Sequence, residues 1–464
     1  MIIRTVLIRT THQTEVEGAL LYAKSLVGQV PGLDQISAGK NESSRGAGYD
    51  YYLELSFSDE HSIGAWAINE LHAPIRNALS QFSETVILDR GLTTASVSSP
   101  TIDIIKLACG PKSEEVDECI RNQCALPINW NEVFLSGMWN KVLFILLERL
   151  RETGSIDVAL QSGNLPLLLL NHWKQLGAVN VHRNKKHIAE LKDIATALDD
   201  VGLEYCVAKG GPALFGRIYS MEERKTYDID FLFRRKDLSL IKDVFFQQGY
   251  VQGHYNHETG EFHPLEPGEL RKWLLHSRGL PNFVKPTGDP FMPHIVVQVQ
   301  FRVGSTISKN IIESDVIIDK RVQRDDVQYV NDDDLFVQTL LHLYRETTEP
   351  SFEEWHMSWN LIKFTDILRL SQYLYNIGSL EGAIVRVKEL DLVEPCLYAL
   401  QLTQLIYPSD AIKHCIEALG GGCERLDEKP TVTEAYVTQH IFTTGFIRNA
   451  PKSDWSRLIP SKTH

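Results

Sequence analysis

The stretch from Tyr205 to Phe233 constrains the fold of this 464-residue chain more than any other part of it. It begins with an apolar run that ends in Lys209-Gly210-Gly211, and it closes with a second apolar run that contains Asp228-Ile229-Asp230. A short segment with helical spacing of apolar residues, up to Tyr219, lies between the two runs. The pattern predicts a strand, a tight glycine turn, a helix and a second strand.

The polar residues of this stretch indicate phosphoryl-group chemistry. Two adjacent glycines let a ligand approach the backbone closely, and the helix that follows offers free N–H groups to a phosphate. Side chains two residues apart on a strand point to the same face, so we expect Asp228 and Asp230 to lie side by side. Two such carboxylates beside a phosphate cradle form half of a Mg²⁺ site. A solvated turn or a helix start is the structural alternative for this Asp-x-Asp pair.

The order of these residues resembles the DNA polymerase beta-like nucleotidyltransferase superfamily, and within it a bacterial group. The residues that carry the resemblance are Lys209-Gly210, Ala213-Leu214, Arg224 and Asp228-Ile229-Asp230-Phe231-Leu232-Phe233. A weaker likeness extends over residues 125–375. The resemblance implies transfer of a nucleoside monophosphate from a nucleoside triphosphate to a small-molecule or peptide acceptor.

The same resemblance implies roles for individual residues. Asp228 and Asp230 would be the catalytic metal ligands, for Mg²⁺ or alternatively Mn²⁺, with Lys209 as a third catalytic residue. ATP is the expected nucleotide. The residues expected to bind it are Lys209, Gly210, Gly211 and Arg224.

A second apolar strand, Pro293 to Gly304, carries a departure from the superfamily pattern. Alignment on Phe301-Arg302-Val303 puts Gln298 where the superfamily has its third carboxylate, and Gln300 where the group has a histidine. We expect both glutamines to share one face and to line the acceptor side. A neutral amide cannot act as a base. Either the acceptor is already ionised and one metal suffices, or the protein is a sensor that binds nucleotide without turnover.

Residues 1–92 read as β-α-β-β-α-β, which is the ferredoxin-like arrangement. The second helix is expected over Ser62–Asn77, with a kink or a break near Pro74. Residues 1–92 also resemble the stress-responsive dimeric α/β-barrel family, on VPGL…AGKN, YDYYLELSFSD, LHAP and VILDRGL. That resemblance implies a homodimer formed through this domain. His72 matches a histidine that some relatives use on small molecules, and Trp66 stands where they have tyrosine. A structural His72 in a dimerisation or docking domain is one interpretation, and chemistry on a small hydrophobic substrate is the other.

The fold class expected for the whole chain is α+β. A ferredoxin-like dimeric α/β-barrel domain (1–92) and a linker (93–103) precede a helical prelude with a nucleotidyltransferase core built on a mixed sheet (104–305). A C-terminal helical domain (306–428) and a tail (429–464) follow. We also expect one long helix from Trp130 through Leu150, a helix over Lys186–Leu198, and an irregular loop over residues 251–293 that covers the substrate.

Net charge, apolar run length and cysteine pattern restrict the binding partners and the cellular compartment that we expect. The net charge of −13 repels nucleic-acid phosphates, so a groove that tracks nucleic acid is not expected. The apolar runs are too short to span a bilayer, and Met1 leads directly into a strand pattern rather than a signal peptide. Seven cysteines without a paired motif are typical of a reducing compartment. We therefore expect a cytoplasmic protein without membrane partners.

Overall fold

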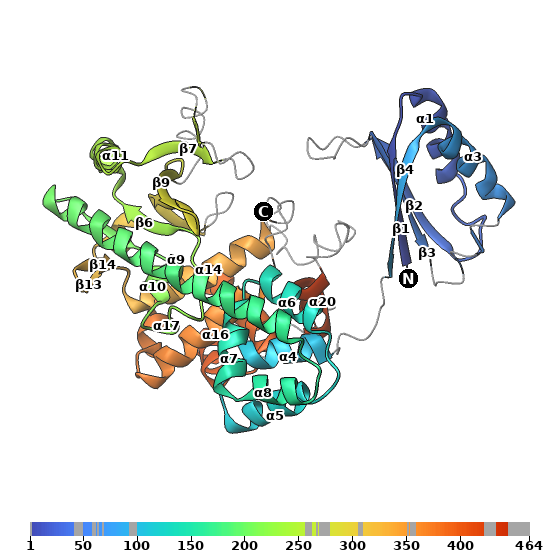
Figure 1. Ribbon diagram of the computed structural model, residues 1–464. Helices are drawn as coiled ribbons and strands as arrows, with labels where there is room; N and C mark the ends of the chain where they lie inside the picture. Colours follow the sequence, from blue (N-terminus) through green and yellow to red (C-terminus); the bar gives the residue numbers. More distant parts are fainter. Residues whose placement is uncertain are drawn as a thin grey trace. The chain divides into compact units, whose positions relative to one another are not determined.

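A computed structural model describes residues 2–40, 50–57, 62, 65–66, 69–91, 100–255, 262–265, 268, 279–304, 310–349, 352, 359–421 and 433–443. The chain divides into two compact units, residues 1–97 and 98–464 (Figure 1). Of the expected linker, residues 93–99 lie outside the described residues, and the remainder already belongs to the first helix of the second unit. Among the helices described, none is both long and apolar enough to cross a membrane.

The N-terminal unit is a four-stranded antiparallel sheet in the order β2-β3-β1-β4, which is the ferredoxin-like order. Its elements are β1 (Ile2–Arg9), α1 (Gln13–Lys24), β2 (Leu33–Lys40), β3 (Tyr51–Phe57), the 3₁₀ turn η1 (Glu70–His72), α3 (Ala73–Phe82) and β4 (Glu84–Gly91). Alternate residues of the strands, such as Val6, Ile8 and Leu53, are buried beneath α1 and α3, which lie on one face of the sheet (Figure 1). The ferredoxin-like expectation is confirmed.

The helix expected over Ser62–Asn77, kinked or broken near Pro74, is broken before that proline, and its last part extends beyond Asn77. Residues 62 and 65–66 are helical, whereas Asn69 is not. The described helix α3 begins at Ala73 and continues to Phe82. Pro74 lies in the first turn of α3, where proline costs no backbone hydrogen bond, so of the two expectations, a kink or a break, the structure has the break.

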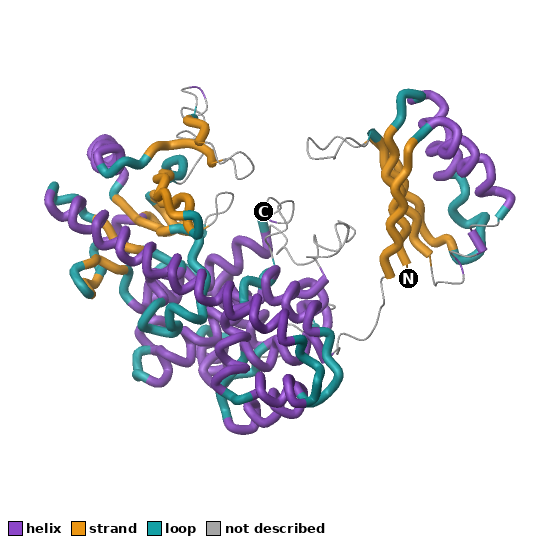
Figure 2. The backbone as a smooth tube through the Cα atoms, viewed as in Figure 1, coloured by secondary structure: helices purple, strands orange, loops and turns teal. Residues whose placement is uncertain are grey.

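The second unit combines a mixed sheet with a larger body of helices, most of which lie to one side of the strands (Figure 2). The helices are α4 (Pro100–Cys109), α5 (Glu114–Cys124), α6 (Trp130–Trp139), α7 (Leu143–Glu152), α8 (Ser155–Gln161), α9 (Leu167–Asp200), α10 (Gly211–Leu214), η2 (Arg235–Asp237), α11 (Leu238–Gln247), α13 (Ser314–Ile318), α14 (Asp332–Thr348), α16 (Leu361–Asn376), α17 (Leu380–Glu389), α18 (Val393–Ile406), α19 (Asp410–Ala418) and α20 (Glu434–Thr443).

The sheet of this unit has eight strands in the order β13-β14-β5-β6-β10-β9-β7-β8. Its strands are β5 (Tyr205–Val207), β6 (Ile229–Phe233), β7 (Val251–Tyr255), β8 (Phe262–Pro264), β9 (Phe283–Asp289), β10 (Met292–Gln300), β13 (Val322–Arg324) and β14 (Val327–Tyr329), and β11 (Arg302–Gly304) pairs separately with β12 (Ile311–Glu313). β6 runs antiparallel to β5 and parallel to β10. The strand of the Asp228-Ile229-Asp230 motif, β6, therefore lies between β5, which precedes the glycine turn, and β10, which carries Gln298 and Gln300.

The single helix expected from Trp130 through Leu150 is two helices, α6 and α7. Asn140 is buried at the break, where its side chain donates to Ser136 O and accepts from Leu361 N–H. Lys141 follows with a positive φ of 60°, which ends the regular helix. Apolar periodicity continues across this break, so periodicity alone could not reveal it.

Other expected bounds are also corrected. The helix Lys186–Leu198 is the second half of α9, a helix of 34 residues. The expected irregular loop 251–293 contains β7, β8 and β9, and the expected helical domain 306–428 begins with strands, of which β13 and β14 extend the main sheet. The tail includes α20, whose Val437 and Ile441 are buried and whose Glu434 pairs with Lys106.

Candidate active site

Two acidic side chains lie at the start of the central strand β6. Asp230 is on β6 and is 4% exposed, and Asp228 immediately precedes the strand and is partly buried. Because Ile229 between them is fully buried in the apolar core, the two carboxyl groups project to the other side of the chain. The pair expected from the sequence is thus brought to one face.

Gln298 and Gln300 lie beside this pair because β10 runs parallel to β6, with Gln298 opposite Asp230. Gln298 Nε2 donates to Asp228 Oδ2 at 2.7 Å, and Gln300 Nε2 donates to Asp230 Oδ1 at 3.0 Å and to Gln298 Oε1 at 3.2 Å. We call these four residues the Asp–Gln cluster. Each glutamine supplies an N–H donor that an acid could not supply, so the amides bind one oxygen of each aspartate.

Burial changes the protonation of the pair. Burial, followed by the neighbouring charge of Asp230, raises the pKa of Asp228 to about 7, against the opposing charges of Lys209, Lys141 and Arg224. Burial also raises the pKa of Asp230, against Lys209 and Arg345. Two carboxylates that are held together out of water and surrounded by cations are a common feature of sites that bind charged ligands.

The two glycines of the motif serve different purposes. Gly210 has φ +104°, and a Cβ there would lie 3.2 Å from Asp230 Oδ2, so the bare backbone leaves that oxygen accessible. A Cβ on Gly211 would clash with the side chain of Thr226, so this glycine permits close packing. The Thr226 hydroxyl is buried and has no hydrogen-bond partner among the described residues.

The helix after the glycines is shorter than expected. It is a single turn, α10, where the sequence predicted helical structure up to Tyr219. One turn has little macrodipole. The positive charge of the site therefore comes mainly from side chains.

The charges of four cations act on the two aspartates: those of Lys141, Lys209 and Arg224 lower the pKa of Asp228, and those of Lys209 and Arg345 lower the pKa of Asp230. Lys141 comes from the break between α6 and α7, and its Nζ lies 5.5 Å from the centre of the Tyr227 ring. Burial lowers its pKa. The sequence predicted neither Lys141 nor Arg345, because both lie within helical patterns and only the fold brings them to the motif.

Arg224 forms an ion pair with Asp366. Its Nη2 donates to Asp366 Oδ2 at 2.8 Å, and the Tyr219 hydroxyl donates to Asp366 Oδ1 at 2.7 Å. The guanidinium group also lies 5.5 Å from the Tyr219 ring centre. Arg224, which the sequence assigned to the nucleotide, therefore has a fixed position, and its charge still lowers the pKa of Asp228.

One face of α14 carries a polar stripe toward the same site: Gln338, His342, Arg345 and Glu346. Gln338 Oε1 accepts from the Lys209 backbone N–H at 3.2 Å. His342 Nε2 lies 2.6 Å from Glu346 Oε1, and Glu346 is also paired with Lys363 on α16.

His72 belongs to the N-terminal unit. Its ring stacks on Trp66, with centroids 4.4 Å apart and 28° between the planes. Trp66 is fully buried. The aromatic residue that the sequence placed beside His72 is therefore in contact with it.

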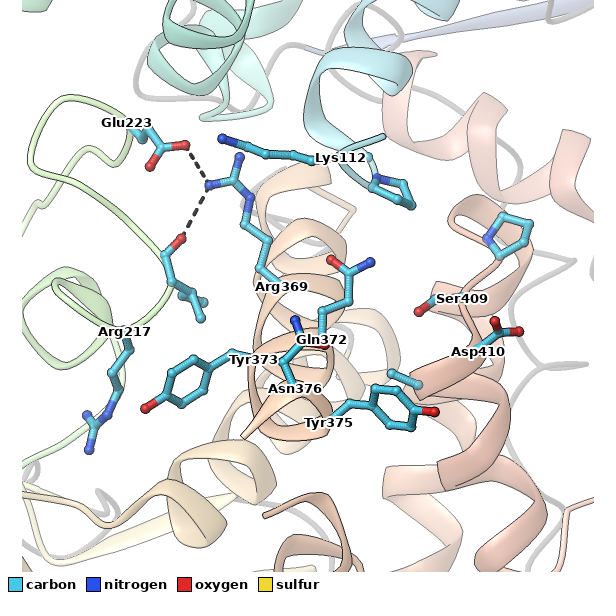
Figure 3. Close-up of a pocket in the computed structure, with 15 residues that line it drawn as sticks. Lys112, Arg217, Glu223, Arg369, Gln372, Tyr373, Tyr375, Asn376, Ser409 and Asp410 are labelled. Atoms are coloured by element: carbon cyan, nitrogen blue, oxygen red, sulfur yellow. Dashed lines mark hydrogen bonds and ion pairs between the residues drawn. The ribbon is translucent and has the colours of Figure 1, made fainter. Parts of the chain in front are cut away.

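A cavity of about 640 Å³ lies along α16 and does not include the Asp–Gln cluster (Figure 3). Arg369 lines it and donates from Nη1 to Glu223 Oε1 at 2.7 Å and to Ile218 O at 3.3 Å. Arg369 also lies 4.7 Å from the Tyr219 ring centre. Tyr219 thus contacts both Arg369, which lines the cavity, and Arg224, whose charge acts on Asp228.

The residues present fit a Mg²⁺ ion whose remaining ligands come from the substrate. The described residues contain no group of three or more His, Cys, Asp or Glu side chains arranged to hold a metal. Asp228 and Asp230 each direct one oxygen to a glutamine, which leaves Asp228 Oδ1 and Asp230 Oδ2 as ligands. Mg²⁺ is commonly bound by one or two carboxylates together with substrate phosphates.

Comparison with known proteins gives one family. The model of a family described as an uncharacterised nucleotidyltransferase matches residues 127–408, which is more than half of the chain. Among curated proteins, none matches this sequence.

Solved structures match the chain over about a fifth of its length. A dimeric ferredoxin-like protein of unknown function from Jannaschia sp. CCS1 is 17% identical, with 20% of this chain and 98% of that chain covered and a TM-score of 0.19. An Arabidopsis thaliana protein is 15% identical, with 21% and 99% covered and a TM-score of 0.19. A dimeric ferredoxin-like protein from Bacteroides fragilis NCTC 9343 is 15% identical, with 20% and 95% covered and a TM-score of 0.17.

Proposed function

The chain belongs to the uncharacterised nucleotidyltransferase family, and from this membership we propose that it transfers a nucleoside monophosphate from a nucleoside triphosphate to a small-molecule or peptide acceptor. One observation carries the proposal. The carboxyl groups of Asp228 and Asp230 share one face at the start of β6, and the positive charges of Lys141, Lys209, Arg224 and Arg345 lower the pKa of one or both of them. A metal-bound triphosphate complements both the acidic and the basic parts of this arrangement.

In this proposal Asp228 and Asp230 hold Mg²⁺, with Mn²⁺ as the alternative. The ion would neutralise charge on the phosphate oxygens and orient the triphosphate. The oxygens left for it are those that the glutamines do not bind, and Gly210 keeps the approach to Asp230 Oδ2 free of a side chain.

The basic side chains bind and orient the phosphates. Lys209 leads into the glycine turn, and its backbone is fixed by Gln338 on α14. Lys141 lies at the break between α6 and α7, and Arg345 lies on α14. The cations that bind the triphosphate and the leaving pyrophosphate would therefore come from three separate segments of the chain. Such preorganised cations stabilise charge that develops during transfer. Arg224, fixed by Asp366, adds to the positive field.

A nucleotide sensor on the same fold is the second candidate, and the Asp–Gln cluster favours it. The position expected for a third carboxylate holds Gln298, whose two polar atoms are both engaged by cluster residues. An amide in this state can neither bind metal as an anion nor accept a proton. A sensor would bind triphosphate without releasing pyrophosphate.

We propose that the N-terminal unit pairs with a second copy of the chain. Its helices cover one face of the sheet (Figure 1), and the resemblance of residues 1–92 to the dimeric α/β-barrel family supports pairing through the other face. That face carries Thr5, Tyr52 and Glu54, which are only partly buried in the single chain. His72 stacked on Trp66 would then have a packing role, in a domain that serves dimerisation.

The experiment for the transferase proposal is calorimetric titration with each of the four nucleoside triphosphates, with Mg²⁺ and with EDTA. We expect Mg²⁺-dependent binding, strongest for ATP, that disappears in the Asp228→Asn/Asp230→Asn variant. Asp243→Asn, at an exposed position on α11, is the matched control and should bind as the wild type does. Absence of binding by any triphosphate would overturn the proposal. Binding without pyrophosphate release would favour the sensor.

A further inference from the structure

The polar stripe of α14 faces the candidate active site. Its members, Gln338, His342, Arg345 and Glu346, are spaced by four, three and one residues, which places them on one side of a helix. Gln338 binds the backbone of Lys209, and the charge of Arg345 acts on Asp230. The other side of α14 packs into the core through residues such as Leu335 and Leu343. The stripe is therefore a wall of the site.

His342 is oriented in this wall by Glu346. Its Nε2 lies 2.6 Å from Glu346 Oε1, and the charge of Lys363 together with the hydrogen bonds from His342 and Lys363 holds the pKa of Glu346 well below its usual range despite burial. A carboxylate only accepts hydrogen bonds, so His342 Nε2 carries the proton and donates it. The lone pair of the ring is then at Nδ1. The His342 side chain is 29% exposed and that of Glu346 only 5%, so the ring is the more accessible member of the pair.

The Asp–Gln cluster contains no group that could take up a proton during transfer. Gln298 and Gln300 are amides, and in the proposed function Asp228 and Asp230 are engaged by the metal ion. A neutral imidazole held by a buried carboxylate is a common general base. Within the α14 wall, His342 is the residue with this property, since Arg345 is a cation and Glu346 accepts a hydrogen bond from His342 and is paired with Lys363.

We propose that His342 is the general base of the transfer reaction, that Glu346 is its positioning residue, and that the acceptor is therefore an alcohol and not an already ionised phosphate or carboxylate. This inference rests on the proposed nucleotidyltransferase function. The acceptor oxygen forms a bond to the α-phosphorus, and the bond from the α-phosphorus to the β-bridging oxygen breaks. Pyrophosphate leaves with that electron pair, and the hydroxyl proton passes to His342 Nδ1 and then to water.

The charges that face His342 come from three elements. Burial lowers its pKa to about 4, Glu346 on its own helix opposes this shift, and Lys209 and Lys363 contribute to it. Lys141 and Arg345 act on Glu346. A bound triphosphate adds negative charge beside Lys209 and so shifts the pKa of His342 upward again. The imidazole is neutral, as a base must be, at physiological pH.

The test uses the full-length protein, Mg²⁺-ATP and two hydroxyl probes, water and glycerol, with pyrophosphate release as the readout. In His342→Ala we expect the rate to fall by about 10²–10⁴-fold while the Kd of Mg²⁺-ATP changes less than about threefold. Added imidazole should restore part of the rate in His342→Ala. In Glu346→Gln the rate should fall with no response to imidazole.

A second His–Glu pair on the protein provides the control. His414 on α19 contacts Glu381 on α17 at the surface, and His414→Ala should release pyrophosphate at the wild-type rate. Circular dichroism melting identifies any variant that fails to fold. A His342→Ala variant as fast as the wild type, or one that imidazole does not rescue, would overturn the assignment, as would wild-type protein that binds Mg²⁺-ATP but turns over with neither probe. Wild-type protein that binds no triphosphate would overturn the proposed function itself.

Discussion

Gln298 donates a hydrogen bond from Nε2 to Asp228 Oδ2 across 2.7 Å. An amide thus stabilises the charged form of an aspartate whose burial opposes that charge. The amide donors of Gln298 and Gln300 offset part of the repulsion between the two neighbouring carboxyl groups. These hydrogen bonds also define which of their oxygens are left for a ligand, and several measurements follow from them.

The pH dependence of stability should report the Asp228–Asp230 pair. The pKa of Asp228 in the folded protein is raised from 3.8 to about 7, so the folded state binds a proton more tightly than the unfolded state. Stability therefore falls as pH rises from about 4 to 7. Asp228→Asn should be more stable than the wild type by about 1–3 kcal/mol at pH 7.5 in EDTA, and the difference should vanish near pH 4. Urea denaturation measures this, and an equal difference at both pH values would contradict it.

A third carboxylate in the cluster should destabilise the metal-free protein. Gln298→Glu removes the donor to Asp228 and adds a like charge, so we expect a loss of about 2 kcal/mol in EDTA and a larger gain on addition of Mg²⁺ than in the wild type. Gln323→Glu, at an exposed position of β13, is the control. An unchanged melting temperature in EDTA would contradict the prediction, and a large gain of turnover in Gln298→Glu would favour the sensor.

Gly211 should tolerate no side chain while Thr226 is present. A Cβ at residue 211 would clash with the Thr226 hydroxyl and lie 3.0 Å from its Cβ, so Gly211→Ala should cost about 1–3 kcal/mol. Thr226→Gly in the same chain should remove most of the clash, which a double-mutant cycle of unfolding free energies detects. Gly18→Ala on α1, where nothing lies within 4 Å of the added Cβ, should not destabilise. Additive effects at residues 211 and 226 would contradict the packing explanation.

Lys141 should contribute to triphosphate binding. Its charge acts on Asp228, although it lies far from the motif in sequence. Lys141→Met should weaken Mg²⁺-ATP binding by about 10–100-fold, because a hydrogen bond to a charged group is worth about 1.5–3 kcal/mol. Calorimetry measures the Kd, and Lys388→Met, exposed on α17, should bind normally. Equal affinity in Lys141→Met and the wild type would exclude this contact.

The oligomeric state should depend on the open face of the N-terminal sheet. Light scattering of the full-length protein should give twice the chain mass of 52.7 kDa. Tyr52→Arg places a charge on that face and should shift the protein toward the monomer, whereas Leu21→Arg, on an exposed position of α1, should not. A monomeric wild type would refute dimerisation.

Local sequence predicted the elements whose pattern repeats over a few residues. The β-α-β-β-α-β succession of residues 1–92 follows from its strand and helix patterns. The strand–turn–strand of the motif and the shared face of Asp228 and Asp230 follow from alternation and glycine placement. The helix bounds near Asn140 and Ala73 did not, because tertiary hydrogen bonds or a proline decide them. Strands β13 and β14 were also missed, since three-residue strands carry too little periodicity.

The sequence by itself determined the family and the carboxylate pair, because motif spacing along one strand specifies which side chains share a face. Only the tertiary structure decided what surrounds that pair. Gln298 lies opposite Asp230 because β6 and β10 pair in parallel. Lys141 came from the break between α6 and α7, and Arg345 and His342 came from α14; all three are more than fifty residues away from Asp228 in the chain. Such contacts depend on the packing of whole elements, and no local pattern encodes them.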